Sequence, residues 1–238
     1  MSKNNALTVF STFAVDKLID ENRKAIREQK GGPAFFIASA LKRENINFNF
    51  VTAPLVKVEI LIKDGEEFGR IKQKNKPKKI NFSTITTPSL LISTILNDFD
   101  LKGAGVFKGN IFLDIQGYVR NGAKFGKKKQ WKLPKKIASS IFCLKGTEEE
   151  LKFIPFSLQR EQKQKILLIT KGKLGCEIWV KGENKIIKPK KVIENIKNTI
   201  GAGDSFFAYF ISEFLRTENP FLSVKHATDK TSEFLTHS

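Results

Sequence analysis

The chain has 238 residues, 40% of them hydrophobic, and carries 42 Lys or Arg against 24 Asp or Glu, for a net charge of +18. This length fits one large α/β domain, and the apolar content is sufficient to fill its core. No apolar run approaches the roughly 20 residues that a bilayer-spanning helix needs, so we expect no membrane partner.

The positive charge allows a polyanionic partner such as nucleic acid. The lysines are spread along the chain, however, and abundant Lys, Asn, Ile and Phe are typical of A/T-biased coding, which favours a compositional origin of the charge. Cys143 and Cys176 have neither metal-ligand nor disulfide-framework spacing, and the first ten residues lack signal-peptide architecture. We therefore expect a cytoplasmic protein.

The N-terminal region reads as a strand, a loop, a glycine-rich turn and a helix. Residues 7–13 (LTVFSTF) form an apolar, β-branched run typical of a buried strand, and Asp16 follows just past its end. The turn at residues 31–34 (GGPA) precedes a helix, because apolar positions 36, 37, 40 and 41 have helical spacing. Residues 47–53 are predicted to form the next strand.

A small β lid is predicted at about residues 54–83. Positions 56, 58, 60 and 62 alternate strictly between apolar and other residues before a turn at residues 63–65, which indicates a half-exposed hairpin. Residues 70–81 carry the densest charge run. We interpret this run as a solvated loop or lid edge, because no aromatic residue interleaves with the lysines to stack on bases.

Strands and helices alternate along the remaining chain. The sequence predicts strands at residues 89–95, 110–115 and 165–170, a hairpin at residues 177–188 and a helix at residues 204–216. This order indicates an α/β fold with a mostly parallel, Rossmann-like sheet flanked by helices. No repeat or linker divides the chain, so we expect residues 1–238 to form a single domain with its lid.

The segment 198–208 (NTIGAGDSFFA) places two glycines and a carboxylate at the start of an apolar helix. If the helix begins near Gly203 or Asp204, its unpaired N–H groups can bind an anion. A carboxylate beside such a site makes sense if it accepts a proton from an attacking hydroxyl while the N–H groups stabilise a transferred phosphoryl group. The alternative is that Asp204 is only a helix N-cap.

This segment, extended to NTIGAGDSFFAYF, closely resembles the C-terminal signature of the ribokinase-like, or PfkB, carbohydrate kinases. Other segments match in the same order along the chain. Asp16 resembles the family's sugar-contacting aspartate, the turn at residues 31–34 resembles its Gly-Gly substrate turn, and residues 169–175 (ITKGKLG) resemble the segment that lies along the nucleotide. The matches thus touch both ends and the middle of the chain.

The resemblance implies a ribokinase-like fold and transfer of a phosphoryl group from ATP, with Mg²⁺, to a hydroxyl of a sugar, polyol or nucleoside. It implies that Asp204 is the general base and that the anion hole consists of the backbone N–H groups of Gly201, Ala202 and Gly203. Substrate hydroxyls would contact Asp16 and the Gly31-Gly32 turn. The residues implied beside the nucleotide are Thr170, Gly172, Gly175 and Asn198.

The chain departs from the family pattern at two positions near the expected ligands. Phe36 aligns with the usual sugar-binding Asn, and its ring cannot make those hydrogen bonds, so it would line the acceptor site without holding ribose in the usual way. In the Asn-x-x-Glu segment, Lys145 replaces Asn, whereas Glu148 is retained. Glu148 would then help to arrange a magnesium-bound water, and Lys145 would lie near the phosphates. The alternative is that both residues lie at a solvated helix start.

Residues 113–120 (LDIQGYVR) resemble an Asp-x-Gln-Gly-x-x-Arg segment of compact PfkB members, some of which act on inositol. Arg120 would then bind phosphate oxygens or a polyol, unless it is a surface residue. The chain is short for the family and stops at TSEFLTHS, which implies weak nucleotide binding or a wall completed by a neighbouring subunit.

The first interpretation is therefore an ATP-dependent kinase of a sugar or cyclic polyol, present as a monomer or homodimer. A second is a protein of the same fold that binds ligand but has lost turnover. A nucleoside kinase and a basic nucleic-acid-binding protein remain as further alternatives, and only the charge supports the last.

Overall fold

The computed structural model describes residues 6–20, 24–63, 66–71, 76–122, 127–193 and 199–236. Asn198, two residues of the predicted hairpin turn (64 and 65) and part of the charge run (72–75) lie outside the described residues. Within the described part, no helix is both long and apolar enough to cross a membrane.

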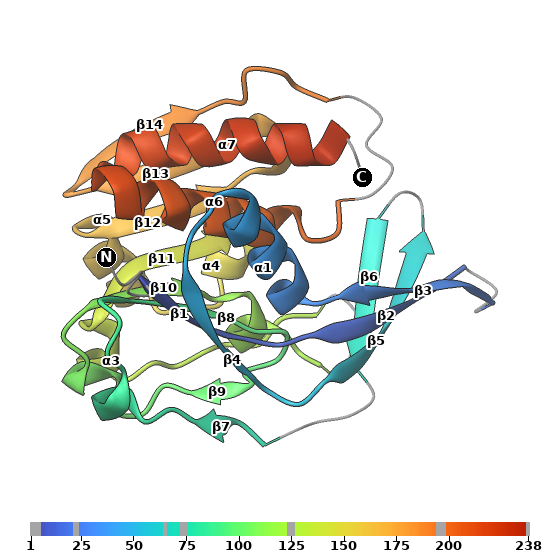
Figure 1. Ribbon diagram of the computed structural model, residues 1–238, viewed down its shortest axis with the longest axis horizontal. Coiled ribbons are helices and arrows are strands. Elements are labelled where there is room, and N and C mark those ends of the chain that lie inside the picture. The colour runs from blue at the N-terminus through green and yellow to red at the C-terminus, as the bar shows by residue number, and fades with distance from the viewer. Residues whose placement is uncertain are drawn as a thin grey trace.

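The main sheet has eight strands in the order β14-β13-β12-β11-β10-β8-β1-β4 (Figure 1). Its strands are β1 (Leu7–Ser11), β4 (Phe48–Thr52), β8 (Ser89–Ser93), β10 (Asn110–Asp114), β11 (Ile141–Thr147), β12 (Ile166–Thr170), β13 (Cys176–Val180) and β14 (Glu183–Ile187). Every neighbouring pair from β4 to β12 is parallel, and β13 and β14 are antiparallel additions at one edge. The predicted α/β class with a mostly parallel sheet is confirmed.

Helices cover both faces of this sheet. One face packs against α1 (Pro33–Arg43), α6 (Ala202–Thr217) and α7 (Pro220–Thr236). The other packs against α2 (Gln116–Val119), α3 (Lys135–Ala138), α4 (Glu148–Leu151) and α5 (Phe156–Lys163). In β8, Leu91 faces the first layer, while Leu90 and Ile92 face the second. Burial of both faces explains why the central strands read as continuous apolar runs.

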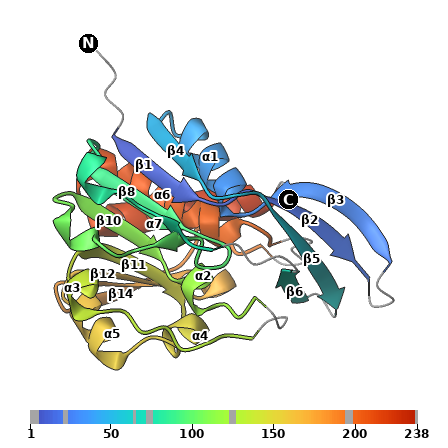
Figure 2. The ribbon, with the colours of Figure 1, turned by 90° about the horizontal axis from the view of Figure 1, so that it is seen from below.

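A second, four-stranded sheet projects from one side of the main sheet (Figures 1 and 2). It has the order β3-β2-β5-β6 and consists of β2 (Ala14–Ile19), β3 (Ala25–Gly31), β5 (Val56–Lys63) and β6 (Glu66–Ile71). We call it the small sheet. Strands β5 and β6 are the predicted hairpin, but β2 and β3 replace the loop expected before the glycine-rich turn. Asp16 therefore lies within a strand, whose residues alternate between buried and half-buried positions at its start.

Short elements complete the fold. They are β7 (Lys78–Lys79), β9 (Phe99–Asp100) and the 3₁₀ helices η1 (Phe82–Thr84), η2 (Ala104–Val106) and η3 (Gly172–Leu174). Strands β7 and β9 pair in parallel, so the last two lysines of the charge run, Lys78 and Lys79, are held beside Phe99 and Asp100 by strand pairing.

Candidate active site

The start of α6 is the centre of the site. Gly201 is its N-cap, with φ of +80°, a left-handed conformation that favours glycine. A Cβ on Gly201 would lie 2.2 Å from atoms of the Phe36 ring, so the ring packs against the Gly201 backbone and leaves no room for a side chain there. The N–H of Ala202 donates to the carbonyl of Thr199 at 3.1 Å. Of the three N–H groups expected in the anion hole, that one has a backbone partner in this structure.

Two cavities meet at this helix start. The first, of about 390 Å³, lies between the main body and the small sheet, and we call it the small-sheet cavity. The second, of about 360 Å³, is bounded by α7, and we call it the α7 cavity. Four residues line both cavities: Thr147, Thr170, Thr199 and Gly203. Asp204 lines the small-sheet cavity. A ligand in either cavity would therefore reach the same helix terminus.

Most residues predicted on the acceptor side lie together. Asp16, Gly32, Phe36 and Arg120 all line the small-sheet cavity, and Asp16 is only 3% exposed. Gly32 has φ of +78°, and a Cβ there would lie 2.6 Å from the carbonyl oxygen of Thr12. The Arg120 guanidinium donates to the carbonyl of Ile95 at 3.3 Å, so it is anchored at the cavity and is not a free surface side chain.

The predicted nucleotide-side residues Thr170, Gly172 and Gly175 line the α7 cavity. Helix α7 contributes part of the same wall, through Thr228, Thr231, Ser232 and Leu235. These four residues are not among those predicted from the sequence, although their i, i+3 and i+4 spacing is a helical signal.

Glu148, expected beside magnesium-bound water, is exposed at the start of α4 and lines neither cavity. Glu150 lines the small-sheet cavity instead. A capping box fixes this arrangement: Glu150 accepts from the N–H of Thr147 at 2.8 Å, and the Thr147 hydroxyl accepts from the N–H of Glu150 at 3.1 Å. Among the described residues, no three His, Cys, Asp or Glu side chains are grouped to hold a metal ion.

Lys145 does not lie at a solvated helix start. It belongs to β11, is 3% exposed, and its Nζ donates to Asp114 Oδ2 at 2.8 Å. The same Nζ lies 3.2 Å from the position that a Cβ of Gly203 would occupy, so the ammonium group stands beside the α6 terminus. Burial lowers the pKa of Lys145, but the charges of Asp114 and Asp204 outweigh this effect and raise it overall. Lys145 therefore keeps its positive charge at the site.

Asp204 is linked to this pair through a serine. The Ser93 hydroxyl lies 3.3 Å from Asp204 Oδ1 and 3.2 Å from Asp114 Oδ2, so its single proton can be donated to either carboxylate. Burial raises the pKa of Asp204 to about 7, with a further increase from the charge of Asp114 and opposing effects of Lys145 and Arg120. The carboxylate thus changes protonation state near neutral pH.

Two further lysines line the small-sheet cavity, Lys127 and Lys128, and neither is among the residues predicted from the sequence.

Comparison with known proteins supports the same family. Residues 125–229 match the model of the pfkB family carbohydrate kinases. A search of curated protein sequences gives no significant match.

Solved structures of ribokinase-family proteins resemble the chain over nearly its whole length. A pyrophosphate-dependent kinase in the ribokinase family, complexed with a pyrophosphate analog and myo-inositol, has a TM-score of 0.75 at 17% identity, covering 97% of this chain and 95% of that one. Ribokinase from Thermotoga maritima has a TM-score of 0.69 at 18% identity, with coverage of 97% and 93%. Arabidopsis thaliana ribokinase, complexed with ribose and ATP, has a TM-score of 0.70 at 15% identity, with coverage of 96% and 91%. On these grounds the chain has a ribokinase-like fold, and its residues 125–229 match the pfkB family of carbohydrate kinases.

Proposed function

We propose that the protein transfers the terminal phosphoryl group of ATP to a hydroxyl group of a sugar or cyclic polyol. The family match and the kinases among the similar structures support a carbohydrate kinase. The observation that carries the proposal is the position of Asp204, at the first turn of α6, on the cavity that meets the α7 cavity at that helix start.

In this proposal Asp204 is the general base. Its carboxylate accepts the proton of the acceptor hydroxyl, the hydroxyl oxygen forms a bond to the terminal phosphorus, and the bond from that phosphorus to the leaving diphosphate breaks. A base whose pKa of about 7 lies near the working pH combines a large ionised fraction with good proton affinity. The positive end of α6 would stabilise charge on the transferred group, with the Gly201-Gly203 backbone as the anion hole. The Ala202 N–H would then exchange its bond to Thr199 for one to the ligand.

The acceptor would occupy the small-sheet cavity. The buried Asp16 carboxylate suits adjacent substrate hydroxyls, which are donors. Among the described residues, none hydrogen-bonds with the buried Thr94 hydroxyl, which also belongs to the cavity wall. A substrate hydroxyl could satisfy it. Phe36 offers a ring rather than an amide, and the similar kinase complexed with myo-inositol supports a cyclic polyol.

The donor would place its base in the α7 cavity, beside Thr170, Gly172 and Gly175, and its terminal phosphates near Lys145. The described residues do not fit a magnesium site formed by protein ligands alone, so Mg²⁺ in this proposal arrives with the phosphates of ATP. The exposed Glu148 would act only through water. The small sheet would serve as the lid that limits hydrolysis of ATP by water. Cys143 and Cys176 are free and buried, which suits the proposed cytoplasmic setting.

The test is ADP release with Mg-ATP across a panel of hexoses, pentoses, inositols and nucleosides, run beside Asp204→Asn. We expect ADP release that depends on an acceptor and disappears in the variant. A parallel series with pyrophosphate, followed by phosphate release, covers the donor used by one similar kinase. Full turnover in Asp204→Asn would contradict the assigned base.

A binding protein without turnover is the second candidate. Two groups near the proposed site of phosphoryl transfer already have partners within the protein: Lys145 pairs with Asp114, and the Ala202 N–H bonds to Thr199. No turnover with any acceptor or donor, together with ATP binding measured by calorimetry, would favour it. Salt-dependent DNA retention that persists in Asp204→Asn would instead favour the nucleic-acid alternative.

A further inference from the structure

Two residues outside the predicted site connect the proposed base to the buried lysine. Ser93 ends β8 and Asp114 ends β10, and these neighbouring parallel strands bring both side chains to one edge of the sheet. Both residues are 0% exposed. Asp114 Oδ2 accepts from Lys145 at 2.8 Å and faces the Ser93 hydroxyl at 3.2 Å, while its Oδ1 accepts from the N–H of Gln116 at 3.1 Å. Asp114 therefore accepts from Lys145 and the Gln116 N–H, and it shares the Ser93 hydroxyl proton with Asp204.

We propose that Ser93, Asp114 and Lys145 form a charge-balancing network that positions Asp204 and controls when its carboxylate accepts a proton. The proposal rests on the assigned role of Asp204 as the base. Asp114 and Ser93 are positioning residues in this scheme, since they act on Asp204 and not on the substrate.

The two charged members act in opposite directions. The Lys145 ammonium favours the ionised form of Asp204, and the Asp114 carboxylate disfavours it. The Ser93 hydroxyl favours the ionised form when it donates to Asp204. Because Asp114 also holds Lys145 in place, the network fixes how far the ammonium group stands from the base.

Other charged groups face the same space and must be considered with the network. Arg120 favours the ionised form of Asp204, and Glu150 interacts with Lys145. The remaining charged residues that line the small-sheet cavity are Asp16, Lys127 and Lys128. None of these belongs to β8, β10 or β11, so changes confined to the network leave them in place.

A purely structural role does not account well for a buried ion pair at this position. Removing two charges from water is costly, and well-packed apolar residues of similar volume often stabilise a protein equally or better. A role in tuning Asp204 gives the pair a function that apolar residues cannot supply. It also makes a prediction that stability alone does not.

The test compares the pH dependence of kcat/KM for Lys145→Met and Asp114→Asn with that of the wild type. We expect Lys145→Met to move the acid limb to higher pH and Asp114→Asn to move it to lower pH, each by at least about 0.5 unit, a threefold change in the protonation equilibrium. Ser93→Ala should move it upward by less. Shifts of the same sign in Lys145→Met and Asp114→Asn, or no shift in either, would overturn the proposal.

Controls separate charge tuning from loss of folding. Lys165→Met removes another partly buried lysine, which pairs with Glu161 at 3.1 Å away from both cavities, and should leave the acid limb unchanged. The double variant Asp114→Asn/Lys145→Met removes both charges of the ion pair together and should give a limb between those of the single variants. Ser93→Ala removes only a hydroxyl, so it tests the network even if a charge variant does not fold.

A second readout does not depend on turnover. Carbon-13 NMR of the Asp204 carboxylate, assigned by its absence in Asp204→Asn, should show the same shifts of its titration midpoint. Midpoint shifts of the expected signs in a protein with no detectable kinase activity would keep the network and reject the proposed function. Turnover with unchanged midpoints would do the reverse.

Discussion

The Asp16 carboxylate occupies the space in which a side chain of residue 31 would stand: its Oδ2 lies 1.7 Å from the position of a Cβ on Gly31. The two residues lie on adjacent strands of the small sheet, with Ala14 paired to Gly31. Glycine is therefore required at residue 31 because a side chain would collide with Asp16, and not because of its backbone angles. It allows a buried carboxylate to face the small-sheet cavity.

Gly31→Ala should consequently displace Asp16 and weaken acceptor binding. Because small displacements of a substrate-positioning group can cost about 100-fold in rate, we expect kcat/KM for the acceptor to fall by about 10- to 100-fold. Nucleotide binding, measured by calorimetry, should stay within about twofold of the wild type, since the α7 cavity does not include this turn. Gly105→Ala is the matched control, because a Cβ there meets neighbours only at 3.6 Å and lies outside both cavities. An unchanged acceptor KM in Gly31→Ala would remove Asp16 from the binding site.

The protonation of Asp204 should also appear in the stability of the fold. Its pKa is raised from the ordinary 3.8 to about 7, so between these pH values the folded protein holds a proton that the unfolded chain has released. Stability therefore falls as pH rises from about 4 to 7, by up to about 1.4 kcal/mol per pH unit, and this loss is complete above pH 7. Partial access of water from the cavity reduces this slope.

Asp204→Asn removes the titrating group, so it should have a higher Tm than the wild type at pH 8. Each kcal/mol corresponds to about 2–4 °C for a protein of this size. The difference in Tm should shrink as the pH is lowered toward 4, because the loss of wild-type stability has only begun near the ordinary pKa of 3.8. Scanning calorimetry from pH 4 to 9 measures this directly. A difference in Tm that is constant across the range would show that the pKa of the Asp204 carboxyl is not raised.

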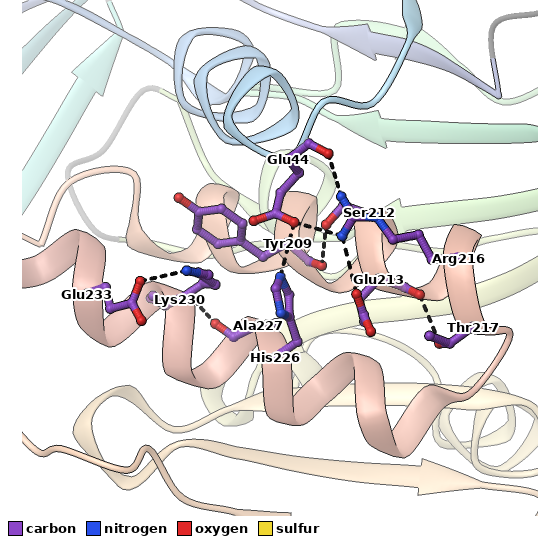
Figure 3. A network of polar contacts seen from close by, with 11 residues as sticks. Glu44, Tyr209, Ser212, Glu213, Arg216, Thr217, His226, Ala227, Lys230 and Glu233 are labelled. Atoms are coloured by element: carbon purple, nitrogen blue, oxygen red, sulfur yellow. Dashed lines mark hydrogen bonds and ion pairs between the residues drawn. The ribbon is translucent and has the colours of Figure 1, made fainter. Parts of the chain in front are cut away.

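A polar network joins the end of α1 to α6 and α7 (Figure 3). Glu44 Oε2 lies 2.8 Å from Arg216 Nη1 and 3.3 Å from His226 Nε2, and the Arg216 guanidinium also donates to the Glu44 backbone carbonyl. The Glu44 side chain is only 10% exposed. Because the N-terminal end of α6 carries the proposed base, this network at its other end helps to fix the helix on which the site depends.

Glu44→Ala should destabilise the fold by about 1–3 kcal/mol, because it removes the nearly buried carboxylate to which Arg216 donates. Glu233→Ala is the control, since Glu233 pairs with Lys230 at 2.8 Å but is 64% exposed, and such surface pairs contribute less than about 1 kcal/mol. Urea unfolding compares the two variants. Equal losses of stability would indicate that the Glu44 network contributes no more than an exposed ion pair.

The sequence predicts the parts of this molecule that are encoded locally. The apolar run of β12, the helical spacing in α6 and the GAGD segment each have a short-range pattern that matches the observed element. Strands β2 and β3 are missed because Asp16 and Lys17 interrupt the apolar residues of β2, and because β3 consists mostly of exposed polar and charged residues. The approach of Ser93, Asp114 and Lys145 depends on strand order, which no local pattern encodes. The signal that could have identified Lys145 as a buried charge is its position within the apolar sequence of β11.

Gly203 provides the sharpest test of the donor side. A Cβ there would lie 3.2 Å from the Lys145 ammonium, at the point where the two cavities meet, so a larger side chain would fill the space proposed for the terminal phosphates. Gly203→Val should reduce kcat by at least about 100-fold, because it removes stabilisation of the transferred group at the helix terminus.

Calorimetry of the same variant distinguishes blocked phosphate binding from a disrupted cavity. ATP binding should weaken more than tenfold, whereas adenosine, which needs only the α7 cavity, should bind nearly as in the wild type. Gly105→Ala again serves as the control for a neutral methyl group. An unchanged kcat in Gly203→Val would remove the anion-hole assignment, and equal loss of ATP and adenosine binding would show that the substitution disrupts the α7 cavity itself.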